Sequence, residues 1–188
     1  MRVSDHRYSR DRQRFDLALR LIRHEARTHT IKEWTGLSDD RIRKLYRSYC
    51  QHEGAAAVTR HRGKSPRQAA FFFRNPELTF HAAQLASLYL IYGLVSTAGG
   101  GLESSHRVGS LESGTLLCQV YEAYLELHTP ASISFEHAWF LLLALARHDE
   151  VGVSRCNDCG CLRLRDLLAR HKHTCCSCRQ GAPPALTH

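Results

Sequence analysis

The pattern of apolar and polar positions predicts a helix near the start of the chain. In residues 11–27, DRQRFDLALRLIRHEAR, apolar side chains recur every three or four positions, and most of the remaining positions hold arginine. This spacing places the apolar side chains on one face of an amphipathic helix. The members of that face are Phe15, Ala18, Leu19, Ile22 and Ala26.

A second and a third helix, joined by a tight turn, are predicted in residues 28–49. The second helix runs through Ile31 to about Trp34 and stops at Gly36, which allows a sharp turn. Ser38 is a good N-cap for the third helix, and the acidic residues Asp39 and Asp40 that follow favour the positive end of its dipole. Within the third helix, an apolar stripe is formed by Ile42, Leu45 and Tyr49.

The middle of the chain predicts buried helices. The segments ELTFHAAQLASLYLIYGLV (77–95), SGTLLCQVYEAYLELH (113–128) and SFEHAWFLLLALARHD (134–149) are apolar on most sides, and Ser134 is a plausible cap for the last. Residues 50–67 read as a loop, and residues 97–114 as a flexible connection. No alternating strand pattern is found before residue 150, and the tail at 181–188 is expected to be disordered.

Charge is distributed unevenly along the chain, whose net charge is +8. Residues 1–67 hold 17 Lys/Arg and 8 Asp/Glu, residues 68–149 hold 3 and 7, and residues 150–188 hold 6 and 3. Two basic ends therefore flank a slightly acidic middle. A basic balance of this kind indicates an acidic partner, of which nucleic acid is the commonest.

The sequence also indicates a cytoplasmic location. The first residues, MRVSDHRYSRDRQRFD, lack the apolar region of a signal peptide, and no run reaches 18 apolar residues, so no membrane contact is expected. In a reducing cytosol, clustered cysteines favour metal binding over disulfides.

Six of the eight cysteines lie in residues 155–178 and suggest a zinc site. One CxxC is formed by Cys156 and Cys159 and another by Cys175 and Cys178, with fifteen residues between the pairs. Two such turns supply four sulfurs to a tetrahedral Zn²⁺. Four protein ligands leave no open position, so we expect one structural Zn²⁺ per chain, whose binding energy folds this segment.

Other ligand sets remain open. Cys161 and Cys176 allow CxC registers, although CxC suits a site with one metal ion less well. His171 or His173 could replace one ligand. The same thiolates could also hold an iron–sulfur cluster, and redox-active thiols are a further reading. We prefer the two CxxC pairs.

Two motifs resemble catalytic sites only in part. His148 and Glu150 before the first CxxC resemble a zinc deaminase, but Arg155 stands where that motif has proline. His24 and His29 resemble HExxH, but they are five residues apart and so lie off a common helix face. No nucleophile motif or phosphate-binding loop is present, and we expect no enzymatic activity.

The TGLS turn before a basic helix fits a helix-turn-helix that binds DNA. The side chains expected to meet bases or phosphates are Arg41, Arg43, Lys44 and Arg47. Lys32 occupies a position where such motifs usually hold a small residue. The alternative is an ordinary helical hairpin with a solvated basic face.

Three segments resemble a known family: LSDDRIRKLYRSY, FHAAQLASLYLIY, and SFEHAWFLLLALA leading into CNDC and CCSC. Together they resemble the FlhC family of flagellar transcriptional activator subunits over roughly residues 12–180. The resemblance implies a largely helical chain that binds zinc through four cysteines, here Cys156, Cys159, Cys175 and Cys178. It also implies a hetero-oligomer with an FlhD-type subunit, binding to promoter DNA of flagellar operons, and recruitment of RNA polymerase.

These observations predict a mainly α fold with a helix-turn-helix-like N-terminal part and a small C-terminal four-cysteine zinc module. We divide the chain into basic N-terminal helices at 1–67, an apolar core or oligomerisation region at 68–149, and a zinc module with a flexible tail at 150–188. The expected function is that of a DNA-binding activator subunit. The alternative is a zinc-ribbon adaptor that binds protein or RNA without reading DNA sequence.

Overall fold

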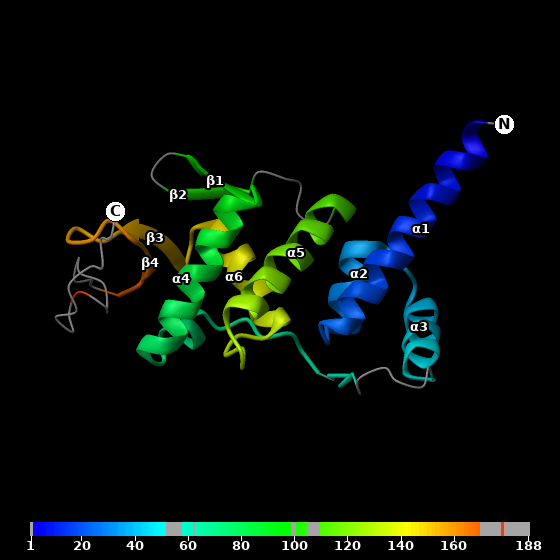
Figure 1. Cartoon of the computed structure of the whole chain (residues 1–188), viewed down its shortest axis with the longest axis horizontal. Coiled ribbons are helices and arrows are strands. Elements are labelled where there is room, and N and C mark those ends of the chain that lie inside the picture. The colour runs from blue at the N-terminus through cyan, green and yellow to red at the C-terminus, as the bar shows by residue number, and fades with distance from the viewer. Residues whose placement is uncertain are drawn as a thin grey trace. The chain divides into compact units, whose positions relative to one another are not determined.

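The computed structural model of the chain describes residues 2–51, 58–61, 63–98, 101–104, 110–169 and 178. Within these residues the fold is mainly helical, as the sequence predicted (Figure 1). The helices are α1 (Arg2–Arg23), α2 (Thr28–Thr35), α3 (Asp39–Gln51), the 3₁₀ helix η1 (Ala69–Phe73), α4 (Pro76–Ile91), α5 (Leu111–Leu127) and α6 (Phe135–Arg147). The strands are β1 (Val95–Ala98), β2 (Gly101–Ser104), β3 (Val151–Arg155) and β4 (Leu162–Asp166). The tail at 181–188 lies outside the described residues.

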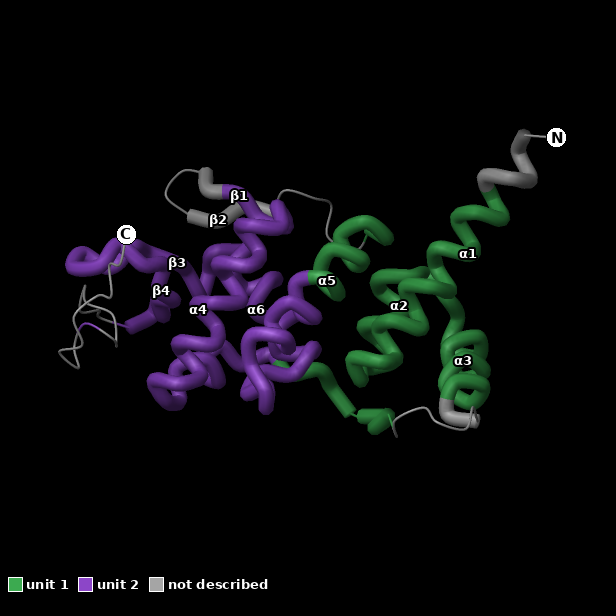
Figure 2. Tube along the Cα trace, in the orientation of Figure 1, with its two compact units in different colours: residues 1–66, 106–119 green, residues 67–105, 120–188 purple. Residues whose placement is uncertain are grey.

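The chain divides into two compact units (Figure 2). Unit 1 comprises Met1–Pro66 and His106–Gln119, and unit 2 comprises Arg67–Ser105 and Val120–His188. The first half of α5 therefore belongs to unit 1 and the second half to unit 2.

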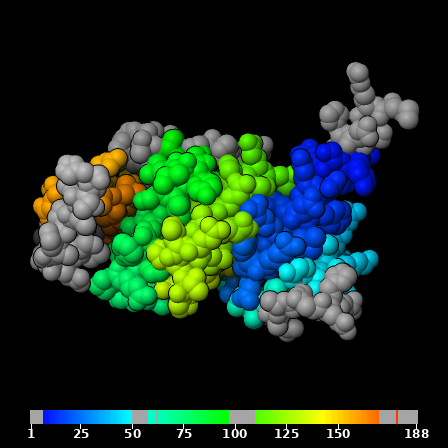
Figure 3. Space-filling model, viewed as in Figure 1, coloured from blue at the N-terminus to red at the C-terminus, as the bar shows by residue number. Residues whose placement is uncertain are grey.

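Unit 1 is built from α1, α2 and α3, whose surfaces adjoin (Figure 3). Its core includes Leu21, Ile22, Ile31, Trp34 and Ile42, all of which are at most 2 % exposed. Burial of such side chains stabilises a fold by about 1.5–3 kcal/mol each, and more for tryptophan. The helical periodicity of the first 50 residues thus becomes a packed three-helix core.

The first helix differs from its predicted range of 11–27. α1 begins by Arg2 and ends at Arg23. It ends early because Glu25 adopts a left-handed backbone conformation, with φ of 57°, which turns the chain toward α2. Ala26, predicted to lie on the helix, is instead buried at this corner.

The corner between α2 and α3 forms as predicted. Gly36 has φ of 66° and its N–H donates to the carbonyl of Lys32, 2.8 Å away, which closes the end of α2. Ser38 lies directly before α3, and its Oγ accepts a hydrogen bond from Arg41 N at 3.5 Å. Leu37, between them, is buried. A glycine C-cap and a serine N-cap therefore set the turn.

The apolar stripe of α3 also differs from the prediction. Ile42 is buried as expected, but the second fully packed side chain is Tyr46, while Leu45 and Tyr49 are half-buried. Tyr46 can enter the core because its hydroxyl donates to the carbonyl of Ala26 at 2.7 Å. A tyrosine that finds a buried acceptor packs as a large apolar side chain.

The first half of α5 also belongs to unit 1, and it packs against α1 and α2 at Gly114. A methyl group at this position would lie 2.9 Å from Leu17 Cδ2 and 3.0 Å from Trp34 Cε3. Only glycine lets the helix backbone approach these two side chains so closely.

Unit 2 is organised around α4 and α6, which contact one another. Asn75 caps α4 by accepting a hydrogen bond from Leu78 N at 2.7 Å, and Ser134 accepts one from His137 N at 3.5 Å at the start of α6. The hydroxyl of Tyr89, in α4, donates to the carbonyl of Ala138, in α6, at 2.6 Å. The predicted Ser134 cap is therefore confirmed.

The segment predicted as a patternless connection contains a hairpin, which corrects the sequence analysis. β1 pairs antiparallel with β2, with Val95 opposite Ser104 and Ala98 opposite Gly101. Strands of four residues are too short for alternation to stand out, and glycine is depleted in strands. The sequence pattern therefore gave no sign of this pairing.

The second hairpin joins β3 to β4, with Val151 opposite Asp166 and Arg155 opposite Leu162. Val151 and Leu164 are buried, and β3 and β4 contact α6 and α4 respectively. The hairpin thus attaches the cysteine-rich segment to the helical part of unit 2. No helix among the described residues has both the length and the apolar character that a membrane crossing requires.

Candidate functional site

The first candidate site is the outward face of α3. Ile42 and Tyr46 point into the core of unit 1, so the side chains between them project away from it. The exposed basic side chains are Arg41, Arg43, Lys44 and Arg47. The structure therefore places all four predicted DNA-contacting residues on the solvent side of one helix.

These four cations differ in their surroundings. Arg43 Nη1 lies 3.1 Å from Asp40 Oδ1, and the Arg41 guanidinium lies 5.9 Å from the centre of the Phe15 ring. In the described part of the chain, Lys44 and Arg47 have no ion-pair partner. An exposed pair such as Arg43–Asp40 contributes roughly 0–1 kcal/mol to stability. Arg43 can therefore exchange Asp40 for another anion at little cost in free energy.

Lys32 lies on the surface of the corner between α2 and α3 and does not interfere with its packing. Its side chain is exposed, and its Nζ lies 3.6 Å from Asp39 Oδ1, at the first residue of α3. The lysine therefore crosses the turn on the surface and does not pack against it. The small residue usually found here is not required at this corner.

A segment that the sequence analysis left as loop makes specific contacts beside α3. Residues 58–61, which we call the strap, contact the corner between α1 and α2: Thr59 N donates to Glu25 Oε1 at 3.0 Å. The Arg60 guanidinium lies 5.2 Å from the centre of the Tyr46 ring. The partners are more than ten residues apart in sequence, so no local pattern could have indicated them.

The second candidate site is the turn between β3 and β4. Cys156 follows β3, and its N–H donates to the carbonyl of Cys161 at 2.9 Å. Gly160 N donates to the carbonyl of Cys156 at 2.9 Å, and Gly160 has φ of 70°. These bonds curl the CxxC into a tight loop that directs its thiols to one side, a conformation that glycine makes accessible.

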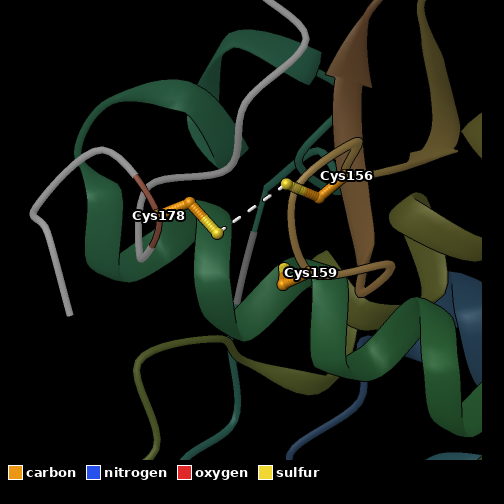
Figure 4. A group of neighbouring side chains, drawn as sticks. All are labelled: Cys156, Cys159 and Cys178. Carbon is orange, nitrogen blue, oxygen red and sulfur yellow. Dashed lines mark hydrogen bonds between the residues drawn. The ribbon is translucent and has the colours of Figure 1, made fainter. Parts of the chain in front are cut away.

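Three cysteine sulfurs gather at this turn. The sulfur atoms of Cys156, Cys159 and Cys178 lie within 4.8 Å of one another. Figure 4 shows the sulfurs of Cys156 and Cys178 pointing toward one another, 3.9 Å apart. With a Zn–S bond of about 2.3 Å, two sulfurs on a tetrahedral zinc lie about 3.8 Å apart. The cluster can therefore hold a metal ion such as zinc.

The other predicted sulfur ligand lies outside the described residues. Cys175, together with Cys176, His171 and His173, is in a segment that the structure does not describe. Cys161 is described, and it is exposed and not part of the three-sulfur cluster. Its backbone carbonyl, and not its thiol, contributes to the turn.

The two partial catalytic motifs are not assembled as sites in the described structure. His24 follows the end of α1 and His29 lies in α2, so the turn at Glu25 separates them and they do not share one helix. His148 ends α6 in a left-handed conformation with φ of 53°. Glu150 N donates to Asp149 Oδ1 at 2.9 Å, as in a simple turn.

No protein-family model matches the chain, and a search of curated proteins finds no match.

Proposed function

We propose that the chain is a DNA-binding subunit of a transcriptional activator similar to FlhC, in which α3 is the reading helix. The observation that carries the proposal is the α2–Gly36–α3 corner with four basic side chains on the outer face of α3. A helix of this kind fits the major groove of B-DNA, and the preceding helix crosses the phosphate backbone. Arginine and lysine then contact guanine edges or phosphates.

Lys44 and Arg47 are expected to contribute most. Neither has an ion-pair partner among the described residues, so neither gives up an interaction on binding. Arg43 exchanges its exposed pair with Asp40 for DNA contact, and Arg41 leaves the Phe15 ring. Replacing a side chain that reads a base costs about 1–3 kcal/mol of discrimination.

The cysteine cluster is proposed to bind one structural Zn²⁺ through Cys156, Cys159, Cys175 and Cys178. Zinc with four thiolates has no open position for water, so it would contribute folding energy and no catalysis. The neighbouring Arg155 Nη1 donates to the carbonyl of Gly160 at 3.3 Å and places a positive charge close to the thiolates.

The remaining part of the proposal concerns partners: an FlhD-type subunit, promoter DNA of flagellar operons and RNA polymerase. Support for a protein partner comes from large apolar side chains exposed in unit 2, including Phe80 at 44 %, Ile91 at 76 % and Leu127 at 64 %. A protein subunit that covered these side chains would remove their apolar surface from water. Co-purification followed by measurement of mass and zinc per complex tests this part.

Selection of binding sites from a randomised duplex library tests the central claim. We expect the wild-type chain, with its partner where one co-purifies, to enrich a defined base sequence. Arg47→Ala and Lys44→Ala should weaken binding to that sequence and relax preference at particular bases. Arg74→Ala is the matched control, because Arg74 is an exposed arginine in unit 2.

The outcomes separate the two candidate functions. Enrichment of a sequence that depends on Arg47 supports a reading helix. Binding to RNA or protein without any enriched duplex sequence supports the alternative, a zinc-ribbon adaptor, for which the strand–CxxC–strand arrangement of β3 and β4 is the favouring observation.

A further inference from the structure

We infer that Arg23 and Arg60 form a phosphate clamp beside the reading helix, and that the strap, residues 58–61, holds Arg60 in place. The inference rests on the proposed function, since it assigns sequence-independent contacts to the same DNA-binding surface. It concerns residues outside the helix-turn-helix, and it predicts a different experimental signature from that of the residues on α3.

Arg60 is fixed by two neighbours. Its guanidinium carbon lies 5.2 Å from the centre of the Tyr46 ring, and one terminal nitrogen donates to Thr28 Oγ1 at 3.3 Å. Thr28 is the first residue of α2, the helix expected to cross the phosphate backbone. Arg60 therefore bridges the start of α2 and the middle of α3.

Glu25 anchors the strap on both sides of Arg60. Its Oε1 accepts a hydrogen bond from Thr59 N at 3.0 Å, and its Oε2 lies 2.9 Å from His61 Nε2. Burial alone would raise the pKa of Glu25, but the Thr59 hydrogen bond and the His61 ring together bring the pKa below its ordinary value. The carboxylate thus stays ionised near neutral pH and acts as the latch of the strap.

Arg23, the last residue of α1, lies over a ring at a neighbouring position of α3. Its guanidinium lies 5.8 Å from the centre of the Tyr49 ring. Tyr46 and Tyr49 are three residues apart, so they lie next to one another on the helix. Two arginines from different parts of the chain therefore each lie over an aromatic ring, and the two rings are at neighbouring positions of α3.

The chemistry of these arginines suits phosphate. A guanidinium has five N–H donors in a planar fork, and Arg60 uses one of them on Thr28. Both arginines are exposed, and no carboxylate in the described part of the chain pairs with either. A ring beneath each cation restricts its motion, so less side-chain entropy is lost when a phosphate is bound.

The position favours the DNA backbone over bases. The two arginines flank α3 and do not project from the face that carries Lys44 and Arg47. A helix that enters the major groove has phosphates along its edges. Contacts from the edges fix the position of the protein without reading sequence.

The salt dependence of binding tests the clamp. Affinity for a short duplex of arbitrary sequence is measured for the full chain across a salt series, because each phosphate contact contributes about 0.9 to the slope of log K against log salt. Arg60→Gln and Arg23→Gln should each lower the slope by about 0.9, equally for all duplex sequences. The control is Arg74→Gln, since Arg74 also stacks on an aromatic ring, Phe71 at 5.3 Å, but in unit 2.

A second variant tests the latch, because the loss of its charge and the loss of its positioning role change the affinity for DNA in opposite directions. Glu25→Gly removes a negative charge, which by itself should strengthen binding to DNA. Glycine adopts φ of 57° without strain, so the corner should survive the change. If the latch positions Arg60, binding weakens despite the added charge, and the loss disappears in the Arg60→Gln background.

The outcomes distinguish this inference from the proposed function. An unchanged slope in both Arg60→Gln and Arg23→Gln, with wild-type duplex binding intact, overturns the clamp and leaves α3 as reader. Tighter binding by Glu25→Gly overturns the latch. Absence of duplex binding by the wild type overturns the proposed function, and stronger binding to single-stranded RNA with the same slope losses would assign the clamp to RNA and overturn the DNA inference.

Discussion

At the scale of single residues, the Tyr46 hydroxyl joins α3 to the corner between α1 and α2. It donates to the carbonyl of Ala26 at 2.7 Å inside unit 1. We expect Tyr46→Phe to lower the free energy of unfolding by about 1 kcal/mol, because a buried hydrogen bond is lost while the ring remains.

Chemical denaturation measures this loss, and Tyr49→Phe is its control. Tyr49 is half-buried, and its hydroxyl has no hydrogen bond within the described residues. The control should therefore change stability very little. Equal effects of the two substitutions would show that the Ala26 contact contributes nothing specific.

Glycine is favoured at position 36 because of its backbone conformation, and not because neighbouring atoms leave no room for a side chain. A side chain here would meet no atom within 4 Å, yet φ is 66°. Gly36→Ala should cost about 1–2 kcal/mol through the left-handed conformation, and Gly36→Asn should cost less because asparagine tolerates it. Thermal unfolding of the two variants gives the order, and a smaller loss for alanine than for asparagine would contradict this account.

At the scale of elements, the sequence predicted the helices well because their signals are local. The Gly36 and Ser38 signals, and the Ser134 cap, depend on neighbouring residues, and each appears where it was expected. These caps and turns need no knowledge of the rest of the fold. In the cysteine cluster only the CxxC of Cys156 and Cys159 is local, and Cys178, 22 residues after Cys156, was predicted from the spacing of two CxxC pairs that is typical of zinc sites.

What the sequence could not predict depends on distant contacts. Tyr46 packs inside because Ala26 offers a carbonyl twenty residues away, and the strap lies where Glu25 anchors it. In both cases a tertiary contact decides the structure, and no local pattern indicates it.

The hairpin of β1 and β2 was missed for another reason. Its strands pair locally, with Ala98 opposite Gly101, but they are too short to show an alternating pattern.

The strap should loosen in acid. The pKa of Glu25 is depressed in the folded chain, so its contribution to stability is present above the ordinary carboxyl pKa and is lost as pH falls through the folded value. We expect the difference in unfolding free energy between wild type and Glu25→Gly to shrink as pH is lowered into that range. A difference that stays constant with pH would show that the carboxylate does not act through its charge.

The cysteine turn offers a matched pair of substitutions. Cys156→Ser should reduce bound zinc sharply, measured by elemental analysis, because Cys156 belongs to the three-sulfur cluster. Cys161→Ser should leave the zinc content unchanged, since only its backbone takes part in the turn. Zinc retained by the first variant or lost from the second would reverse the ligand assignment.

At the scale of the whole molecule, the proposed DNA-binding residues and the proposed metal ligands lie in different compact units. α3 and the strap belong to unit 1, and the cysteine cluster belongs to unit 2. A structural metal contributes folding energy mainly to the segment that binds it. Loss of the metal should therefore destabilise the β3–β4 segment of unit 2 and leave the stability of unit 1 unchanged.

Chelation followed by hydrogen exchange tests this separation. We expect peptides from β3 and β4 to exchange faster once zinc is removed, while peptides from α1, α2 and α3 keep their protection. The Cys161→Ser variant should respond like the wild type. Faster exchange throughout unit 1 after chelation would show that the two units do not fold independently of the metal.

The shared helix α5 has a consequence for how the chain is made. Gly114 brings α5 against Leu17 and Trp34, so part of unit 1 comes from residues 106–119, which follow the first stretch of unit 2, residues 67–105, in sequence. During synthesis on the ribosome, the first three helices therefore lack the packing of α5 on Leu17 and Trp34 until residue 119 has emerged. A gene fragment that stops at Pro66 would lack this contact permanently, and we expect its product to be less stable than the full chain.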